Sequence, residues 1–198
     1  MNTNRDSETL LLTHTGSKLY GLNHANSDND TYRIIKTLDN NRKRNARQKI
    51  TGNEDELTID FKTFANFAYA GQPQALEAMF SPIATIDHLH EFRSSFYAGL
   101  NQDQMIGRYR KTITKFAHGN FKHRRHAMRL AINLDEAISN RGRFNPRLSN
   151  ENIIKITAQA NDAAYCTHLQ ALSIYDLHLN TDEINANLFA EFAQLQNA

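Results

Sequence analysis

The stretch GSKLYGLNHANSDND, at residues 16–30, decides which fold this chain is expected to adopt. It opens on a Gly-Ser pair and closes on two aspartates, Asp28 and Asp30, that stand one residue apart. A glycine at a turn lets the backbone approach a phosphate closely, and exposed N–H groups at a helix start favour anions. Two carboxylates beside such a turn can hold Mg²⁺ together with substrate phosphates. The alternative is a polar loop in which the aspartates only stabilise a turn.

The sequence around this stretch predicts a small β-sheet. Residues 9–15 (TLLLTHT) are short and apolar, residues 30–38 are β-branched and aromatic, and residues 55–61 (DELTIDF) alternate apolar and polar side chains. Each of these segments is expected to form a strand. A short helix over residues 17–25 is expected between the first two strands, with Ser17 as its N-cap. The Gly-Ser turn would then join a strand to a helix.

Acidic residues on the second and third strands are the candidate metal ligands. If Asp28 and Asp30 begin a strand, both side chains point to one face, because side chains alternate along a strand. A site of this kind needs a third carboxylate from a neighbouring strand. The third strand offers Glu56 and Asp60, which alternate with its apolar residues, and Asp55 lies just before them.

From residue 61 onward the apolar periodicity changes to that of helices. Helices are expected over residues 61–70, 73–81, 86–100, 101–117, 122–139, 150–178 and 181–196. A strand-rich first part followed by a helical remainder predicts an α+β fold. Residues 1–82 are expected to form the core that carries the site, and residues 83–198 a helical region packed on it.

The composition is that of a globular protein. The chain has 198 residues, of which 40% are hydrophobic and 22% charged, and it has no apolar run near the roughly 18 residues of a membrane span. Its beginning lacks the long apolar run of a signal peptide, so none is expected. The single cysteine, Cys166, cannot form an internal disulfide and fits a reducing compartment, which predicts a cytoplasmic protein without a membrane partner.

Positive charge is concentrated in two segments, although the net charge is only +2. Residues 42–49 (RKRNARQK) are expected to form a basic loop. Residues 104–134 contain three histidines and no acid, which leaves a positive surface that either attracts an anion or pairs with acids elsewhere. Eight lysines and arginines lie in this second segment: Arg108, Arg110, Lys111, Lys115, Lys122, Arg124, Arg125 and Arg129.

Gly-Ser, then Asp-x-Asp, then a later acid on a third strand resembles the DNA polymerase β-type nucleotidyltransferase superfamily. The fuller string GSKLYGL…SDND resembles one branch of it, the small predicted nucleotidyltransferases of bacteria and phages that are described as RNA-repair-associated. Residues 61–82 resemble that branch's helix, polar-Pro turn and LE-x-x-F helix, and residues 122–130 (KHRRHAMRL) its K-x-x-x-H-x-x-R-L helix. The matches cover residues 10–148 in the family's order.

Two departures from the branch are visible. Its members often carry a glycine shortly after Asp-x-Asp, where this chain has TYRI at residues 31–34. The polar-Pro turn is Gln72-Pro73 in place of the commoner Asn-Pro. Neither departure falls on the expected metal ligands.

The resemblance implies a role for each site residue. Gly16 and Ser17 would bind the triphosphate, and Asp28 and Asp30 would bind Mg²⁺ or Mn²⁺. Glu56 is the first choice for the third catalytic and metal-binding acid, which would help to activate the acceptor hydroxyl. The alternatives to it, since the strand register is open by one residue, are Asp55 and Asp60.

A basic helix is expected to contribute to binding. Lys122, His126 and Arg129 stand at i, i+4 and i+7 on one helical face and would contact phosphates of the nucleotide or of the acceptor. The implied reaction transfers a nucleoside monophosphate from an NTP or dNTP to an acceptor hydroxyl and releases pyrophosphate. RNA is the expected acceptor, because the two basic segments could follow a phosphate backbone.

Two other functions stay open at this point. The chain could be a nucleic-acid-binding module that keeps the fold without turnover, or it could transfer a nucleotide to a protein. The sequence leaves the nucleotide, the acceptor and the oligomeric state undetermined.

Overall fold

The computed structural model describes residues 8–36, 46–140 and 142–160 of the chain. These residues form two compact units. Unit 1 comprises the described residues up to Phe96 together with Asn145–Leu148, and unit 2 comprises Tyr97–Phe144 and the described residues from Ser149 onward. The expected division into residues 1–82 and 83–198 stays a prediction about where function resides.

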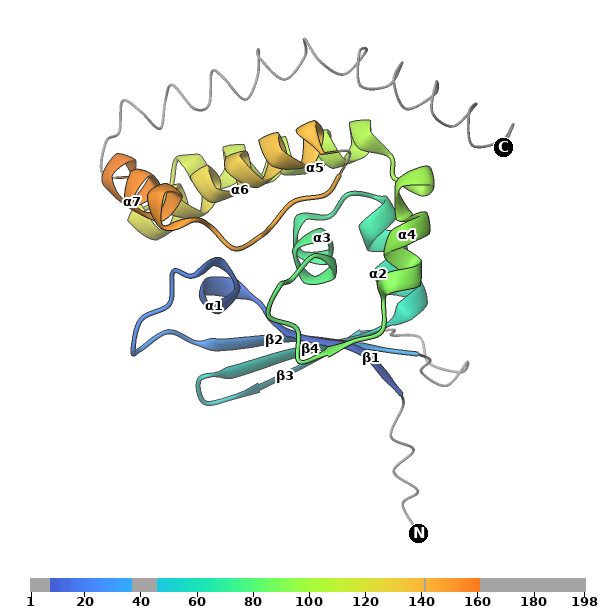
Figure 1. Cartoon of the computed structure of the whole chain (residues 1–198). Helices are drawn as coiled ribbons and strands as arrows, with labels where there is room; N and C mark the ends of the chain where they lie inside the picture. The colour runs from blue at the N-terminus through green and yellow to red at the C-terminus, as the bar shows by residue number, and fades with distance from the viewer. Residues whose placement is uncertain (1–7, 37–45, 141, 161–198) are drawn as a thin grey trace. The chain divides into compact units, whose positions relative to one another are not determined.

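Unit 1 is built on a five-stranded mixed sheet with the strand order β3-β4-β2-β1-β5 (Figure 1). The central strands β2 and β4 are parallel, and the other neighbours are antiparallel. The small mixed sheet and the helices that follow it confirm the predicted α+β fold. The strands are β1 (Thr9–His14), β2 (Asn29–Ile35), β3 (Ala46–Thr51), β4 (Glu54–Asp60) and β5 (Ile86–Asp87).

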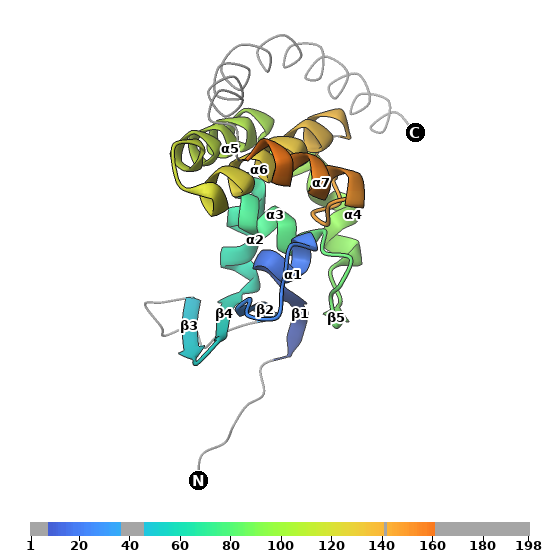
Figure 2. The ribbon, with the colours of Figure 1, turned by 90° about the vertical axis from the view of Figure 1, so that its left-hand side faces the viewer.

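Short helices of unit 1 cover one face of this sheet, as Figures 1 and 2 show. The covered face is apolar: Leu11, Tyr32, Ile34 and Ile59 are each at most 2% exposed. Tyr32 packs edge to face on Phe64 of α2, with 6.3 Å between the ring centroids. The helices are α1 (Gly16–Tyr20), α2 (Phe61–Tyr69), α3 (Pro73–Met79) and α4 (His90–Gly99), whose last residues pass into unit 2.

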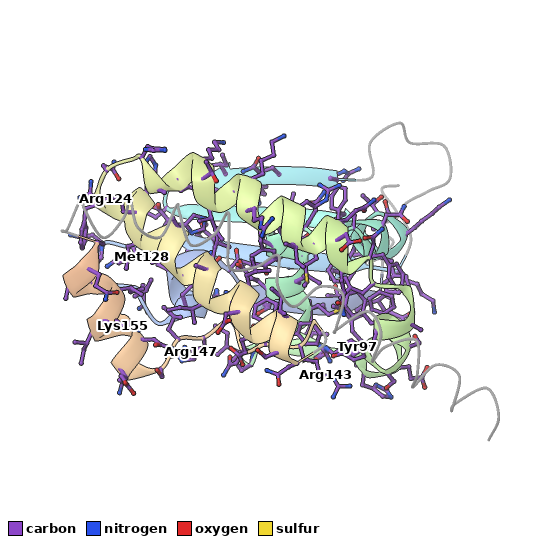
Figure 3. The ribbon with its side chains drawn as sticks, turned by 90° about the horizontal axis from the view of Figure 1, so that it is seen from above. Tyr97, Arg124, Met128, Arg143, Arg147 and Lys155 are labelled. Carbon is purple, nitrogen blue, oxygen red and sulfur yellow. The ribbon has the colours of Figure 1, made fainter. Side chains whose placement is uncertain are left out.

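Unit 2 is helical and contains α5 (Gln102–Ala117), α6 (Phe121–Ser139) and α7 (Asn150–Gln159). Each helix begins at a side-chain cap, because Asn101, Asn120 and Ser149 accept a hydrogen bond from the backbone N–H three residues later. A tight turn at residues 118–120 joins α5 to α6, and the two helices pack against each other. After α6, the guanidinium of Arg143 lies over the ring of Tyr97, 4.5 Å from its centroid (Figure 3).

Three sequence expectations about elements were wrong. Residues 46–49 lie in strand β3 and not in a loop; β3 is exposed throughout, so it lacks the apolar alternation that marks a strand. The helix expected from residue 86 begins at His90, because residues 86–87 pair with β1. The helix expected to reach residue 25 ends at Tyr20, where Gly21 adopts a φ of 76°.

Other expectations concern residues outside the described ranges. They are the basic residues at 42–45, the lone Cys166, and the helices expected over residues 161–178 and 181–196. Among the helices of the described ranges, none combines the length and the apolar character that a membrane crossing requires.

Candidate functional site

The Gly-Ser turn and the acidic strand meet in unit 1. A Cβ placed on Gly16 would lie 2.2 Å from Oδ2 of Asp30, so the carboxylate occupies the space that a side chain would fill. Gly16 also has a φ of +60°, which favours glycine. The backbone N–H of Thr15 donates to the carbonyl oxygen of Asp30 at 2.9 Å, which extends the β1–β2 pairing up to the turn. The structure therefore places Gly16 and Asp30 side by side.

Buried hydrogen bonds hold this turn in place. Tyr20, at the end of the five-residue helix α1, donates its hydroxyl proton to Oε2 of Glu77 at 2.6 Å. Glu77 is only 3% exposed and belongs to the LE-x-x-F segment of α3. At the end of β1, the hydroxyls of Thr13 and Ser81 lie 2.5 Å apart. The role of Glu77 was missed from the sequence, although its motif had been noticed.

The remaining residues of the turn and of the acidic pair lie close by in the chain. Ser17 is the second residue of α1 and is half-buried; the expectation that it is the N-cap was wrong, because α1 begins at Gly16 and its N-cap is Thr15. Asp28 is exposed and immediately precedes β2, so the strand includes only one of the two aspartates. Lys18, which sequence reasoning had passed over, donates to Oδ1 of Asn29 at 2.8 Å and so brings a cation to the start of the acidic strand.

The register between β2 and β4 identifies the carboxylate beside Asp30. These parallel strands pair Asp30 with Asp55 and Tyr32 with Leu57. Residues that pair directly on neighbouring strands present their side chains to the same face, about 5 Å apart. Asp55 therefore shares the face of Asp30, and it also accepts hydrogen bonds from Nε2 of Gln48 at 3.0 and 2.7 Å.

Glu56, the first choice of the sequence analysis, points to the opposite face. It pairs with Thr31 and forms a bidentate ion pair with Arg33, whose Nε and Nη2 lie 3.2 and 3.0 Å from its two oxygens. The hydrogen bond from Arg33 lowers the pKa of the Glu56 carboxyl. The structure thus does not bring Glu56 to Asp30. The acid beside Asp30 is Asp55 and not Glu56 because of the strand register, which the sequence had left open by one residue.

Asp60, the other alternative, has a structural role. It is the N-cap of α2: Oδ1 accepts from the backbone N–H of Thr63 at 2.9 Å, and Oδ2 accepts from the Thr63 hydroxyl at 3.0 Å. The side chain is 7% exposed. A carboxylate used in this way stabilises the helix start, so of the three candidates only Asp55 remains beside Asp30.

The donor set suits a hard divalent cation. Asp28, Asp30 and Asp55 offer carboxylate oxygens, which are the ligands that Mg²⁺ prefers, and phosphate oxygens of a substrate commonly complete such a site. The Asp30 carboxylate lies against the turn, in the space that a Cβ on Gly16 would fill. Across the described part of the chain, no group of three or more acidic, histidine or cysteine side chains is placed so that it could hold a metal ion. The fit of Mg²⁺ to these carboxylates therefore rests on the type of donor and on the register between β2 and β4.

The basic residues of α6 form a series from exposed to buried within unit 2. Lys122 is exposed, His126 is half-buried and Arg129 is 1% exposed. The Nη2 atom of Arg129 lies 3.0 Å from Nδ1 of His126. Because an arginine can only donate, Nδ1 accepts and Nε2 carries the imidazole hydrogen. The ring of Phe116 packs edge to face on this imidazole, with 4.6 Å between centroids.

Burial keeps this histidine neutral. Desolvation, followed by the charges of Arg129 and His123, lowers the pKa of His126 from 6.5 to about 3. At neutral pH its imidazole is therefore an uncharged donor through Nε2.

The mixed sheet of unit 1 thus holds a Gly-Ser turn against an acidic strand. The chain belongs to the RNA repair pathway DNA polymerase beta family, RlaP, whose family model matches residues 1–196. Membership supports nucleotidyltransferase activity in general, with a nucleoside triphosphate as substrate and nucleic acid as the general kind of acceptor.

Solved structures are also similar to this chain. One of them is the crystal structure of a nucleotidyltransferase-like protein from Exiguobacterium sibiricum 255-15. It shares 10% sequence identity with a TM-score of 0.36, and the match covers 93% of this chain and 74% of that one. No curated protein matches the chain.

Proposed function

We propose that the protein transfers a nucleoside monophosphate from an NTP or dNTP to a hydroxyl group of an RNA acceptor and releases pyrophosphate. Family membership supports the class of reaction. One observation carries the site: the Asp30 carboxylate lies against Gly16, with Asp55 paired to it on the neighbouring strand. RNA as the acceptor is supported by the family's description and by the basic residues of unit 2.

Each site residue has a proposed role. Gly16 and Ser17 bind the triphosphate, and Asp28, Asp30 and Asp55 would hold Mg²⁺ or Mn²⁺. When bound, such a cation neutralises phosphate charge and favours the attacking hydroxyl in its deprotonated form. Asp55 replaces Glu56 as the third acid and accepts the proton of that hydroxyl.

Residues of α6 are proposed to assist in binding. Lys122 would contribute positive charge to phosphates of the nucleotide or of the acceptor, and His126 would contribute a neutral N–H donor. Arg129, which was also expected to bind phosphate, is 1% exposed, so its proposed part is to orient His126 through the contact with Nδ1. The hydroxyl oxygen attacks the α-phosphorus, and the bond from that phosphorus to the bridging oxygen breaks. Catalysis in this scheme comes mainly from positioning and from neutralisation of charge.

The test is a transfer assay in which α-labelled NTPs and dNTPs are offered one at a time with Mg²⁺ or Mn²⁺ to a pool of small RNAs. The control is the double variant Asp28→Asn/Asp30→Asn, with its fold checked by circular dichroism. Label that moves to RNA with the natural chain and not with the control supports the proposal and names the nucleotide. Equal transfer by both proteins would refute the mechanism.

A second candidate is a nucleic-acid-binding module without turnover. It is favoured by one observation, that Arg108, Lys111 and Lys115 of α5 are all exposed. It predicts RNA binding that weakens with salt, ignores Mg²⁺ and persists in the double variant, with no transfer under any condition. Label found on a polypeptide instead of RNA would identify a protein-modifying nucleotidyltransferase.

A further inference from the structure

The outward face of α5 carries a line of cations. Arg108, Lys111 and Lys115 are all exposed. Their spacing of i, i+3 and i+7 puts them on one stripe of the helix, over about 10 Å of its length. The buried residues of α5, such as Tyr109 and Ile113, lie on the other side of the helix. The stripe therefore makes no contribution to the apolar packing of α5.

Two more cations lie just beyond the turn that joins α5 to α6. Lys122 and Arg125 lie in the first turns of α6, where Lys122 is exposed and Arg125 is partly exposed. We call these five side chains the cationic face: Arg108, Lys111, Lys115, Lys122 and Arg125. Among the ion pairs of the described residues, none involves a member of this face.

Other basic residues of unit 2 are used by the fold itself. Arg124 donates from Nε to the carbonyl of Ala160 at 2.7 Å and from Nη1 to that of Gly119 at 3.2 Å (Figure 3). Arg129 is 1% exposed and contacts His126. The basic surface expected from the sequence is therefore smaller in the structure, because part of its charge serves packing. What remains exposed is concentrated on the cationic face.

Two aromatic rings lie among these cations. Nζ of Lys115 is 5.5 Å from the centroid of Phe116, and Cζ of Arg125 is 5.5 Å from that of Phe121. Both rings are partly exposed. Rings interleaved with cations are the combination with which proteins bind single-stranded nucleic acid, since the cations neutralise phosphates while rings and guanidinium planes stack on bases.

We propose that the cationic face, with Phe121, docks a single-stranded segment of the RNA acceptor. The proposal rests on the proposed function for the choice of RNA. Like charges gathered on one face repel one another, and phosphates would relieve that repulsion. A duplex would contact the cations through its phosphates, but its bases are paired and stacked and could not stack on the rings. The combination of cations and rings therefore favours a single strand.

The test compares two triple variants of the full chain that remove the same charge. Arg108→Gln/Lys111→Gln/Lys115→Gln removes the α5 part of the cationic face. Lys36→Gln/Lys62→Gln/Lys155→Gln removes three exposed lysines that lie off it. Binding of a fluorescent single-stranded RNA is followed by anisotropy over a range of salt concentrations.

The first variant is expected to bind at least about tenfold more weakly at low salt. The slope of log affinity against log salt should fall by about 2, because each neutralised phosphate of a single strand contributes about 0.7. The second variant should keep the slope of the natural chain. Equal weakening in both variants, or none in the first, would overturn the proposal.

A further variant tests the ring. Phe121→Leu keeps every charge and should weaken binding of the single strand several-fold while leaving a duplex of the same length unaffected. Tighter binding of that duplex than of the single strand by the natural chain would contradict docking of a single strand.

Failure of the docking proposal can be told apart from failure of the proposed function. The variant Asp28→Asn/Asp30→Asn should bind RNA as tightly as the natural chain does. Transfer with an unchanged KM for RNA in the α5 variant would refute the docking face and leave the reaction standing. Absence of transfer, together with loss of binding in the α5 variant, would refute the reaction and support the face.

Discussion

At the scale of single residues, the absence of a side chain at Gly16 is the feature that shapes the candidate site most. Gly16 carries a hydrogen where any other residue carries a Cβ, and that space is occupied by the Asp30 carboxylate. The sequence had suggested glycine for close approach of a phosphate. The structure adds a second reason, since the same absence of a side chain lets the acidic strand approach the turn.

The variant Gly16→Ala should lose transfer activity by about a hundredfold or more, because the new Cβ displaces the Asp30 carboxylate. Gly52→Ala is its matched control: Gly52 has the same φ of +60°, but a Cβ there would meet nothing within 4 Å. Both variants should lose about 1 kcal/mol of stability from backbone strain. Equal loss of transfer in the two variants would contradict the role assigned to the contact.

The third acid can be identified by comparing neighbouring residues on β4. Asp55→Asn should reduce transfer by about a hundredfold or more, since the side chain shares the face of Asp30. Glu56→Gln should change transfer by only a few-fold and stability by at most about 1 kcal/mol, because it removes a partly exposed ion pair with Arg33. Rates measured at saturating NTP distinguish these outcomes, and the reverse pattern would restore Glu56 as the catalytic acid.

His126 should make the stability of unit 2 depend on pH. Its pKa is lowered in the folded state from 6.5 to about 3, so below pH 6.5 the unfolded chain binds the proton more readily than the folded chain. This stabilising contribution is present above pH 6.5 and is lost as the pH falls toward 3. Urea unfolding at two pH values should show the natural chain losing at most about 2 kcal/mol more than His126→Gln between pH 6.5 and 5. The same pH dependence in both proteins would contradict the buried neutral state.

At the scale of elements, strand β4 shows how three acidic side chains can have three different roles. Asp55 faces the candidate site, Glu56 pairs with Arg33 on the other face, and Asp60 caps α2. Alternation along the strand separates the first two. The strand's end, where a helix begins, accounts for the third.

Asp60→Ala should destabilise unit 1 by about 1–2 kcal/mol through loss of the α2 cap, and Asp60→Asn by less, because an amide oxygen can still accept. Chemical unfolding followed by circular dichroism measures both. Transfer by the folded fraction should remain near that of the natural chain. A large loss of transfer in the folded Asp60→Asn protein would show that Asp60 belongs to the site.

Strand β3 is the element that the sequence did not reveal. All of its residues are exposed, and the basic Arg47 and Lys49 pair with Thr58 and Glu56, so they lie on the sheet face that carries Glu56 and not on the face that the helices cover. β3 forms the edge of the sheet beside β4. Charged residues are frequent on such edges, where they oppose pairing with other chains.

At the scale of the whole molecule, binding of nucleotide and metal should stabilise the chain. A non-hydrolysable NTP analogue with Mg²⁺, at about a hundred times its Kd, should increase the free energy of unfolding by about 2.7 kcal/mol. The Tm should then rise by about 5 °C or more. Thermal unfolding should show no such shift for Asp28→Asn/Asp30→Asn or in the presence of a chelator. A shift that survives both changes would mean that the nucleotide binds without the proposed carboxylates.

The sequence by itself determined the class of fold, the strands before and after the Gly-Ser turn, most of the helices between residues 61 and 160, and the family. These features are encoded locally, in apolar periodicity, in turn residues and in motifs that residue types and spacing are enough to recognise. The sequence also predicted that the Gly-Ser turn lies near Asp30, because few residues separate them along the chain.

Only the tertiary structure decided which carboxylate accompanies Asp30, which of the basic residues stay exposed, and that residues 46–51 form a strand. Each of these depends on pairing between segments distant in the chain. A shift of one residue in strand register moves a side chain to the opposite face, and packing decides whether an arginine faces solvent or a backbone carbonyl. No local pattern in the sequence carries that information.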